Sequence, residues 1–218
     1  MKTFKELGLS ESFSNNLEKM KIVVPTEIQD KAIPYLMEGK DVIGGSATGS
    51  GKTLAFGAPI IENLKPGEYV QALIMTPTRE LAEQVAESIE KFANKKLKVL
   101  PVYGGTNIER QIRMIPHSDV IVGTPGRILD HLQRRTLRLD HIKFLVLDEV
   151  DRMFDMGFRN DVERIIRECP EERQTMLFSA TLSADMDYLA HKYTDNPKEV
   201  VVESYVDTSK LKQTYYDV

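Results

Sequence analysis

Residues 41–64 read DVIGGSATGSGKTLAFGAPIIENL, an apolar run, a glycine-rich loop and a helical stretch in direct succession. Glycines in such a loop let successive backbone N–H groups turn toward phosphate oxygens, and the start of the following helix favours negative charge. Lys52 can reach the outer phosphates, and the Thr53 hydroxyl can ligate Mg²⁺. This order predicts a phosphate-binding loop, whose alternative is a glycine-rich turn that merely precedes a helix.

From residue 41 onward, short apolar runs alternate with amphipathic stretches, which is typical of a parallel sheet with helices on both faces. We therefore predict an α/β domain over residues 39–208, with strands at 41–45, 72–76, 98–102, 120–123, 144–148, 175–179 and 199–202. Residues 1–38, with Pro25 and Pro34 as punctuation, are expected to form a helical cap within the same domain.

Composition and charge narrow the class of protein. Hydrophobic residues make up 41% and charged residues 28%, which is ordinary for a folded soluble domain. The net charge of −4 excludes bulk attraction to nucleic acid, so any such site must be local. Cys169 is the single cysteine, and the histidines show no zinc-ligand spacing. Without a signal segment or a membrane-spanning apolar run, a reducing cytoplasm is expected.

Carboxylates cluster after the fifth predicted strand. The apolar run 144–147 leads directly into Asp148-Glu149-Val150-Asp151. An aspartate at a strand tip can hold Mg²⁺, usually through water, and the adjacent glutamate can orient an attacking water. A solvated acidic turn is the alternative. The phosphate loop upstream favours the magnesium site.

The next predicted strand ends in Ser179-Ala180-Thr181. Two hydroxyls that flank a small residue can hydrogen-bond to neighbouring carboxylates and couple a nucleotide site to motion. The alternative is a helix N-cap before 182–193, and one hydroxyl can serve both purposes.

Three further loops suit a nucleic-acid backbone, because each pairs a helix start or a glycine turn with a hydroxyl or a guanidinium. They are Pro77-Thr78-Arg79-Glu80-Leu81-Ala82, Gly104-Gly105 and Thr124-Pro125-Gly126-Arg127, after the second, third and fourth predicted strands. Taken singly, each loop is better explained by a plain capping or turn role, since Thr and Pro commonly begin helices.

In this order, the motifs resemble the DEAD-box family of ATP-dependent RNA helicases, and the resemblance runs from about Phe4 to the end of the chain. It implies a RecA-like P-loop NTPase domain that takes ATP, Mg²⁺ and RNA without base specificity. Pro25-Thr26-Glu27-Ile28-Gln29 looks like the family's Q motif, in which the glutamine reads the adenine edge, and Phe4 looks like its isolated upstream aromatic. The alternative for Gln29 is an exposed helical residue.

The resemblance also implies a role for each motif residue. Lys52, Asp148 and Glu149 would be catalytic, and Thr53, Asp148 and Glu149 would surround the magnesium. The nucleotide would contact Phe4, Ile22, Thr26, Gln29, Ala47, Thr48, Gly49, Ser50, Gly51, Lys52 and Thr53. Coupling to motion would involve Asp151, Ser179 and Thr181. RNA would contact Pro77, Thr78, Arg79, Gly104, Gly105, Thr124, Pro125, Gly126 and Arg127.

The sequence departs from the family pattern at three places. Ser46 replaces the usual first glycine of the phosphate loop, and Val150 replaces an alanine beside the carboxylates. Lys21-Ile22 stands where a Gly-Phe pair usually supplies an adenine-stacking ring, so only apolar contact is expected there.

After Thr181 only one more helix and strand are predicted, and residues 209–218 are expected to begin a linker to a second RecA-like domain that this chain lacks. In the family, that domain supplies arginine fingers, on which phosphoryl transfer depends heavily. We therefore expect weak ATP binding, slow hydrolysis and no unwinding. Two other functions remain open, a nucleotide-switched module that binds a protein partner and a P-loop ATPase that acts on DNA or small molecules.

Overall fold

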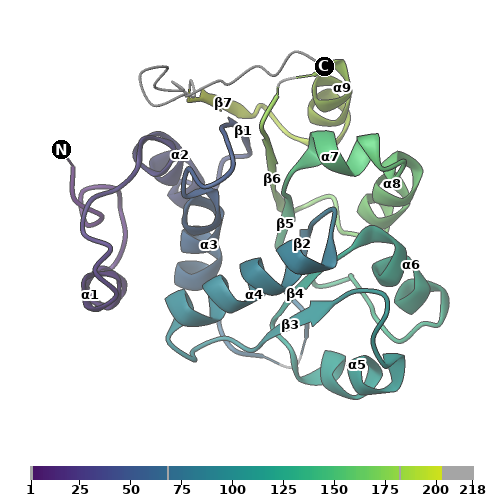
Figure 1. Ribbon diagram of the computed structural model, residues 1–218. Coiled ribbons are helices and arrows are strands. Elements are labelled where there is room, and N and C mark those ends of the chain that lie inside the picture. The colour runs from purple at the N-terminus through teal and green to yellow at the C-terminus, as the bar shows by residue number, and fades with distance from the viewer. Residues whose placement is uncertain (1, 68, 182, 203–218) are drawn as a thin grey trace, which may run out of the picture.

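A computed structural model describes residues 2–67, 69–181 and 183–202 (Figure 1). Its elements are α1 Glu11–Lys19, α2 Glu27–Met37, β1 Val42–Gly45, α3 Lys52–Asn63, β2 Ala72–Met75, α4 Arg79–Ala93, β3 Val99–Val102, α5 Ile108–Met114, the 3₁₀ helix η1 Ile115–His117, β4 Val120–Gly123, α6 Pro125–Gln133, β5 Phe144–Leu147, α7 Val150–Asp155, α8 Arg159–Arg167, β6 Gln174–Ser179, α9 Ala184–Tyr193 and β7 Lys198–Val201. The linker expected at 209–218 lies outside the described residues.

The strands form one parallel sheet in the order β3-β4-β2-β5-β6-β1-β7. Each predicted strand is present, and its bounds differ from the prediction by at most one residue at either end. The predicted α/β class, a parallel sheet with helices on both faces, is therefore confirmed. β3 lies at one edge, where Pro101 can be accommodated although it has no N–H to donate.

Crossovers between parallel strands are right-handed, so the direction in which the chain moves along the strand order decides which face of the sheet each helix covers. The chain moves toward the β3 edge from β1 to β3, and this places α3 and α4 on one face (Figure 1). It then moves back, and α6 to α9 cover the other face. Alternate strand residues divide accordingly, since Ile74 packs into the core on the first side while Leu73 and Met75 pack into the core on the second.

The N-terminal segment packs as a cap of two helices. α2 lies against α3, and apolar residues from Phe4 to Leu36 join the core on that side. Pro34 lies inside α2, so its expected role as punctuation is wrong; the helix continues to Met37. In residues 2–67, 69–181 and 183–202, no helix is both long and apolar enough to span a bilayer.

Neighbouring strands whose next helices lie on opposite faces leave a crevice beyond their carboxyl ends, and ligands bind there. The topology creates such crevices where β1 adjoins β6 and where β2 adjoins β4 and β5. All the predicted motifs that follow strands β1 to β6 lie at this edge of the sheet. The motifs predicted to bind nucleotide belong to the crevice between β1, β6 and β5. The loops predicted to bind a nucleic-acid backbone belong to the crevice around β2 and β4.

Candidate functional site

One pocket of about 320 Å³ lies between the phosphate loop, the start of α4 and the end of β5. Its lining includes four side chains for which a shared magnesium triphosphate was predicted, Lys52, Thr53, Asp148 and Glu149. The remaining lining residues are Thr48, Gly49, Gly51, Leu81, Gln84, Val85 and Ser88. The fold thus gathers groups that are far apart in the sequence around one space that can hold phosphates.

The phosphate loop folds back on itself. Lys52 is buried and donates from Nζ to the Ser46 carbonyl, 3.1 Å away. The Ser50 hydroxyl donates to the Ser46 hydroxyl at 2.9 Å, while the Ser46 amide donates to the Ser179 carbonyl. Ser46, which departs from the family glycine, therefore adds a side-chain bond within the loop. The Lys52 amine is bound to the loop itself in this conformation, so it must break this bond to reach a phosphate.

The Q-motif residues hold the end of the phosphate loop. Gln29 is 4% exposed, so the alternative of an exposed helical residue is wrong. Its Oε1 accepts from the Thr26 amide at 3.0 Å within a capping box, and its Nε2 donates to the Gly51 carbonyl at 3.0 Å. A Cβ on Gly51, whose φ is +96°, would collide with the side chains of Gln29 and Thr26. Only glycine fits this contact.

Asp148 is buried at the tip of β5. Burial raises the pKa of this carboxyl to about 6, although the nearby Lys52 charge lowers it. Among the described residues, its Oδ1 and the Ser179 hydroxyl are buried without a hydrogen-bond partner. Buried polar atoms are nearly always paired, and an unpaired one costs about 1–3 kcal/mol. These two oxygens are therefore available to a bound ligand.

The next carboxylate has an unusual backbone. Glu149 has φ 55° and ψ 55°, the left-handed region that non-glycine residues seldom occupy. Its side chain is mostly buried and receives a bond of 3.2 Å from Arg152. Strain of this kind persists where the surrounding structure enforces it, and such places are often functional. The conformation holds the Glu149 carboxylate at the pocket.

Asp151 links the acidic strand end to the strand beside it. Its Oδ2 accepts from the amide and hydroxyl of Thr181 at 3.2 and 3.1 Å. Burial alone would raise the pKa of Asp151, but the Arg152 amide and the Thr181 contacts outweigh it and hold the pKa below its ordinary value. The alternative N-cap role of the Ser179–Thr181 hydroxyls is wrong, because Ser183 caps α9 and accepts from the Met186 amide.

The three loops that were predicted to contact a nucleic-acid backbone lie next to each other. Thr78 caps α4 by accepting from the Leu81 amide, so the bland capping role is real and leaves Arg79 exposed. Arg79 is paired with Glu80 at 2.9 Å. Its guanidinium lies so close to Gly105 that a Cβ there would come within 3.1 Å of Nη1. Pro77, at the start of this loop, is buried.

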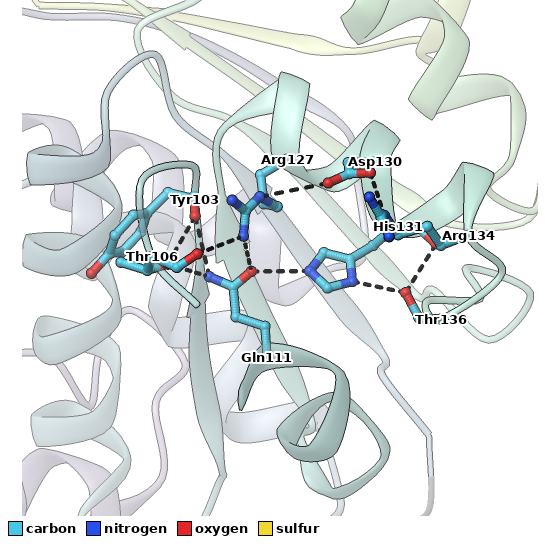
Figure 2. Close-up of polar contacts among 8 residues, drawn as sticks. All are labelled: Tyr103, Thr106, Gln111, Arg127, Asp130, His131, Arg134 and Thr136. Atoms are coloured by element: carbon cyan, nitrogen blue, oxygen red, sulfur yellow. Dashed lines mark hydrogen bonds and ion pairs between the residues drawn. The ribbon is translucent and has the colours of Figure 1, made fainter. Parts of the chain in front are cut away.

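The loop after β4 also contacts this glycine turn. Arg127 donates from Nη1 to the Thr106 carbonyl at 3.3 Å, directly after Gly104-Gly105 (Figure 2). Thr124 and Pro125 begin α6, but the Thr124 side chain makes no capping bond, and Gly126 is exposed. Two arginines from separate loops, Arg79 and Arg127, therefore lie next to one glycine turn.

Some predicted residues lie away from the pocket. Phe4 is buried in the core beneath the cap, and Ile22 packs against that core, so their predicted nucleotide contacts stay predictions. Ala47 and Ser50 belong to the phosphate loop outside the lining residues. Val150 is fully buried in the core on the α6–α9 side, where its extra methyl groups fill apolar space.

Sequence reasoning missed two groups. Gln84 and Ser88 line the pocket from α4, and they stand four residues apart on a polar stripe that resembles an ordinary solvated helix face. Gln111 and His131 are buried polar residues behind the glycine turn. The sequence gives one sign of Gln111 and His131, a polar residue at a helical position that should face the core. It does not show which residues they bond to.

The family model that matches the chain is the DEAD/DEAH box helicase, over residues 26–189. A DEAD-box ATP-dependent RNA helicase CshA from Geobacillus kaustophilus is 49% identical over 99% of this chain and 47% of its own length, and an ATP-dependent RNA helicase CshA from Limosilactobacillus reuteri is 46% identical over 98% and 44%. A crystal structure of a DEAD box protein from Methanococcus jannaschii superimposes with a TM-score of 0.89 at 41% identity, over 92% of this chain and 56% of that one. The chain spans about half the length of the curated relatives it matches.

Proposed function

Because the chain belongs to the DEAD/DEAH box helicase family and has its RecA-like fold, we propose that it is the ATP- and RNA-binding domain of an ATP-dependent RNA helicase. One observation carries this proposal, the single pocket shared by the phosphate loop and the acidic end of β5. The relatives named above are ATP-dependent RNA helicases. We propose that the site residues of this chain have the roles that the family resemblance implies.

At the nucleotide end, each residue has a separate task. Lys52 exchanges its bond to the Ser46 carbonyl for the outer phosphates of ATP. Gln29 has a second lone pair and a second N–H left for the adenine edge while it holds Gly51. Glu149 lies at the pocket and orients the water that attacks the outer phosphate.

The residues present also fit a magnesium ion. Thr53 and Asp148 would hold it, and Asp148 has a buried oxygen without a partner. Within the described residues, no group of three or more His, Cys, Asp or Glu could hold a metal by itself, which agrees with Mg²⁺ that retains waters and phosphate oxygens as ligands. When bound, the ion supplies neutralisation of the phosphate charge.

RNA would run over the loops after β2, β3 and β4. Arg79 and Arg127 both offer guanidinium groups next to the Gly104-Gly105 turn, whose two glycines are exposed. Such contacts grip phosphates and 2′-hydroxyls without reading bases. A local site of this kind agrees with the net charge of −4. Asp151 and Thr181 would relay the nucleotide state to movement through their paired bonds.

We further propose that residues 1–38 and 39–208 act as one domain in a cytoplasmic protein, and that a second RecA-like domain beyond a linker at 209–218 completes the active site. The family relationship and the length of the relatives support this division. Closure of two such domains on ATP and RNA would bring in the arginine fingers that phosphoryl transfer requires.

Steady-state ATPase assays of this chain, with and without single-stranded RNA, test the proposal. We expect weak Mg-ATP binding, slow hydrolysis and no unwinding, because the second domain is missing from the reaction. Robust RNA-stimulated turnover would contradict the two-domain part. Absence of any magnesium-dependent nucleotide binding would contradict the whole assignment.

RNA recognition is tested separately by photocrosslinking matched RNA and DNA oligomers to the chain. Crosslinks at Arg79 and Arg127 that depend on the 2′-hydroxyl are expected. Equal crosslinking of DNA at the same residues would instead favour the ATPase that acts on DNA, and no crosslinking at these loops would favour the nucleotide-switched protein-binding module.

A further inference from the structure

A buried polar cluster lies behind the glycine turn. We call it the Gln111 cluster, and its members are Tyr103, Thr106, Gln111, Arg127, His131 and Thr136 (Figure 2). Gln111 projects from α5 and is 6% exposed, and His131 on α6 is fully buried. The cluster joins three separate segments, the turn after β3, helix α5 and helix α6.

The chemistry of its neighbours fixes the orientation of the Gln111 amide. Nε2 donates to the Tyr103 carbonyl at 3.2 Å and to the Thr106 hydroxyl at 2.9 Å, on the two sides of Gly104-Gly105. Oε1 accepts from Arg127 Nη1 at 3.0 Å. A flipped amide would set N–H against a guanidinium and oxygen against a carbonyl, so only one orientation satisfies both ends.

That orientation fixes the tautomer of His131. Its Nε2 lies 3.0 Å from Gln111 Oε1, which can only accept, so the imidazole must donate from Nε2. Nδ1 then accepts from the Thr136 hydroxyl at 2.8 Å. Burial and the neighbouring Arg127 charge hold the pKa of His131 below its ordinary value and so favour the neutral ring that this pairing requires. His131 thus restrains the Gln111 oxygen from the side opposite the turn.

The consequence falls on Arg127. Its Nη1 is engaged by Gln111 and the Thr106 carbonyl, and its side chain is only 14% exposed. Within the described part of the chain, Nη2 donates no hydrogen bond, and Nε has only a 3.9 Å ion pair with Asp130. A guanidinium is planar, so two fixed bonds at Nη1 also fix the direction of Nη2. The free donor edge is thereby set in place relative to the glycine turn.

We propose that Gln111 is a positioning residue for RNA-backbone binding, which holds the Arg127 guanidinium and the Gly104-Gly105 turn as one unit while His131 holds Gln111. The inference rests on the proposed function, since it assumes that these two loops contact RNA. Pre-ordering matters because each side chain immobilised on binding otherwise weakens the complex by about 0.5–1.5 kcal/mol, or roughly twofold to tenfold in Kd.

The test measures the affinity of the chain for fluorescent oligouridylate by anisotropy, in Gln111→Met and in the matched control Gln174→Met. Gln174 is also a buried glutamine that bonds two carbonyls, those of Leu36 and Lys40, but it is the first residue of β6 and so lies at the amino end of that strand. We expect Kd to rise roughly fivefold in Gln111→Met and less than about twofold in the control. Circular dichroism confirms that both variants are folded at the assay temperature.

A double-mutant cycle separates positioning from general destabilisation. In an Arg127→Ala background, Gln111→Met should raise Kd by clearly less than it does in wild type, because one of the two groups that Gln111 positions is gone and only the glycine turn remains. Additive effects would overturn the inference. Should Gln111→Met fail to fold, Thr106→Val removes the exposed acceptor of Gln111 Nε2 and should raise Kd about twofold to threefold, and an unchanged Kd would overturn it.

Different results would contradict the positioning role of Gln111 and the proposed RNA-binding function. If wild type binds RNA and Arg127→Ala weakens it, but Gln111→Met leaves Kd unchanged, the positioning role is wrong and the proposed function stands. If Arg127→Ala leaves RNA binding unchanged, the proposed backbone site is wrong and the positioning role falls with it. Binding of a fluorescent ATP analogue should be unchanged in Gln111→Met in every case where the inference holds.

Discussion

The nucleotide pocket and the Gln111 cluster both lie at the carboxyl ends of the strands, but they differ in whether their buried polar atoms have hydrogen-bond partners. In the pocket, Asp148 Oδ1 is buried and has no hydrogen-bond partner among the described residues. In the cluster, both ring nitrogens of His131 and both amide atoms of Gln111 are bonded. One region is complete as folded, whereas the other is completed only by what it binds.

The difference teaches where stability and function conflict. A buried carboxylate with a raised pKa and a glutamate in left-handed backbone both destabilise the ligand-free chain. A satisfied network rigidifies its surroundings and holds one geometry. Substitutions should therefore stabilise the first region while impairing binding, and should destabilise the second.

Asp148→Asn should give the largest change. Above pH 6 it removes a buried charge and should raise the free energy of unfolding without ligand by up to about 3 kcal/mol, measured by urea denaturation. Stabilisation by Mg-nucleotide should be lost in the same variant. Because the folded carboxyl has the higher pKa, its own contribution to stability is full below about pH 4 and is lost as the pH rises through about 6. The gain from Asn should therefore vanish at low pH, and a gain that persists there would refute this explanation.

Lys52→Ala should weaken binding of a fluorescent Mg-ATP analogue roughly tenfold to a hundredfold, since a charge-assisted bond to phosphate is lost. The variant should still fold, because Lys52 bonds only the Ser46 carbonyl in the free loop. Lys40→Ala, which removes an exposed surface amine, is the control and should bind normally. Equal binding by both variants would contradict the phosphate role of the loop.

His131→Phe should act in the opposite direction to Asp148→Asn and lower the free energy of unfolding by about 1–2 kcal/mol, because two buried bonds disappear. The folded pKa of His131 is depressed, so its stabilisation is present above pH 6.5 and is lost as the pH falls below that value. The variant should lack this loss. Urea titrations at several pH values measure it, and an identical pH dependence in both proteins would be evidence against a buried neutral ring.

Glu80→Gln should have the smallest effect. Its pair with Arg79 is exposed and contributes little to stability, so the melting temperature should barely change. Freeing Arg79 should tighten RNA binding by about twofold at low salt. Glu87→Gln, which breaks another exposed pair farther along α4, is the control. A large loss of stability would show that this pair has a structural role.

Much of this architecture could be predicted from sequence, because it depends on local pattern. Apolar runs located the strands, and motifs at strand ends located the pocket, since parallel strands present those ends together. What the sequence could not show depends on contacts between distant segments. The burial of Gln29 depends on Gly51, and the Gln111 cluster joins α5 to α6 across a turn. Pro34 was misjudged because the backbone hydrogen bond that it removes from α2 is outweighed by the burial of neighbouring residues such as Ile33 and Leu36.

The bond from Gln29 to the Gly51 carbonyl links the stability of α2 to that of the phosphate loop. Since the same side chain closes the first turn of α2 and restrains the phosphate loop, any molecule that tightens the loop must also protect the amides of the cap from hydrogen exchange. Hydrogen exchange of the cap amides therefore reports whether nucleotide is bound. If the first turn of α2 opens more readily, the free energy of nucleotide binding becomes weaker by the same amount.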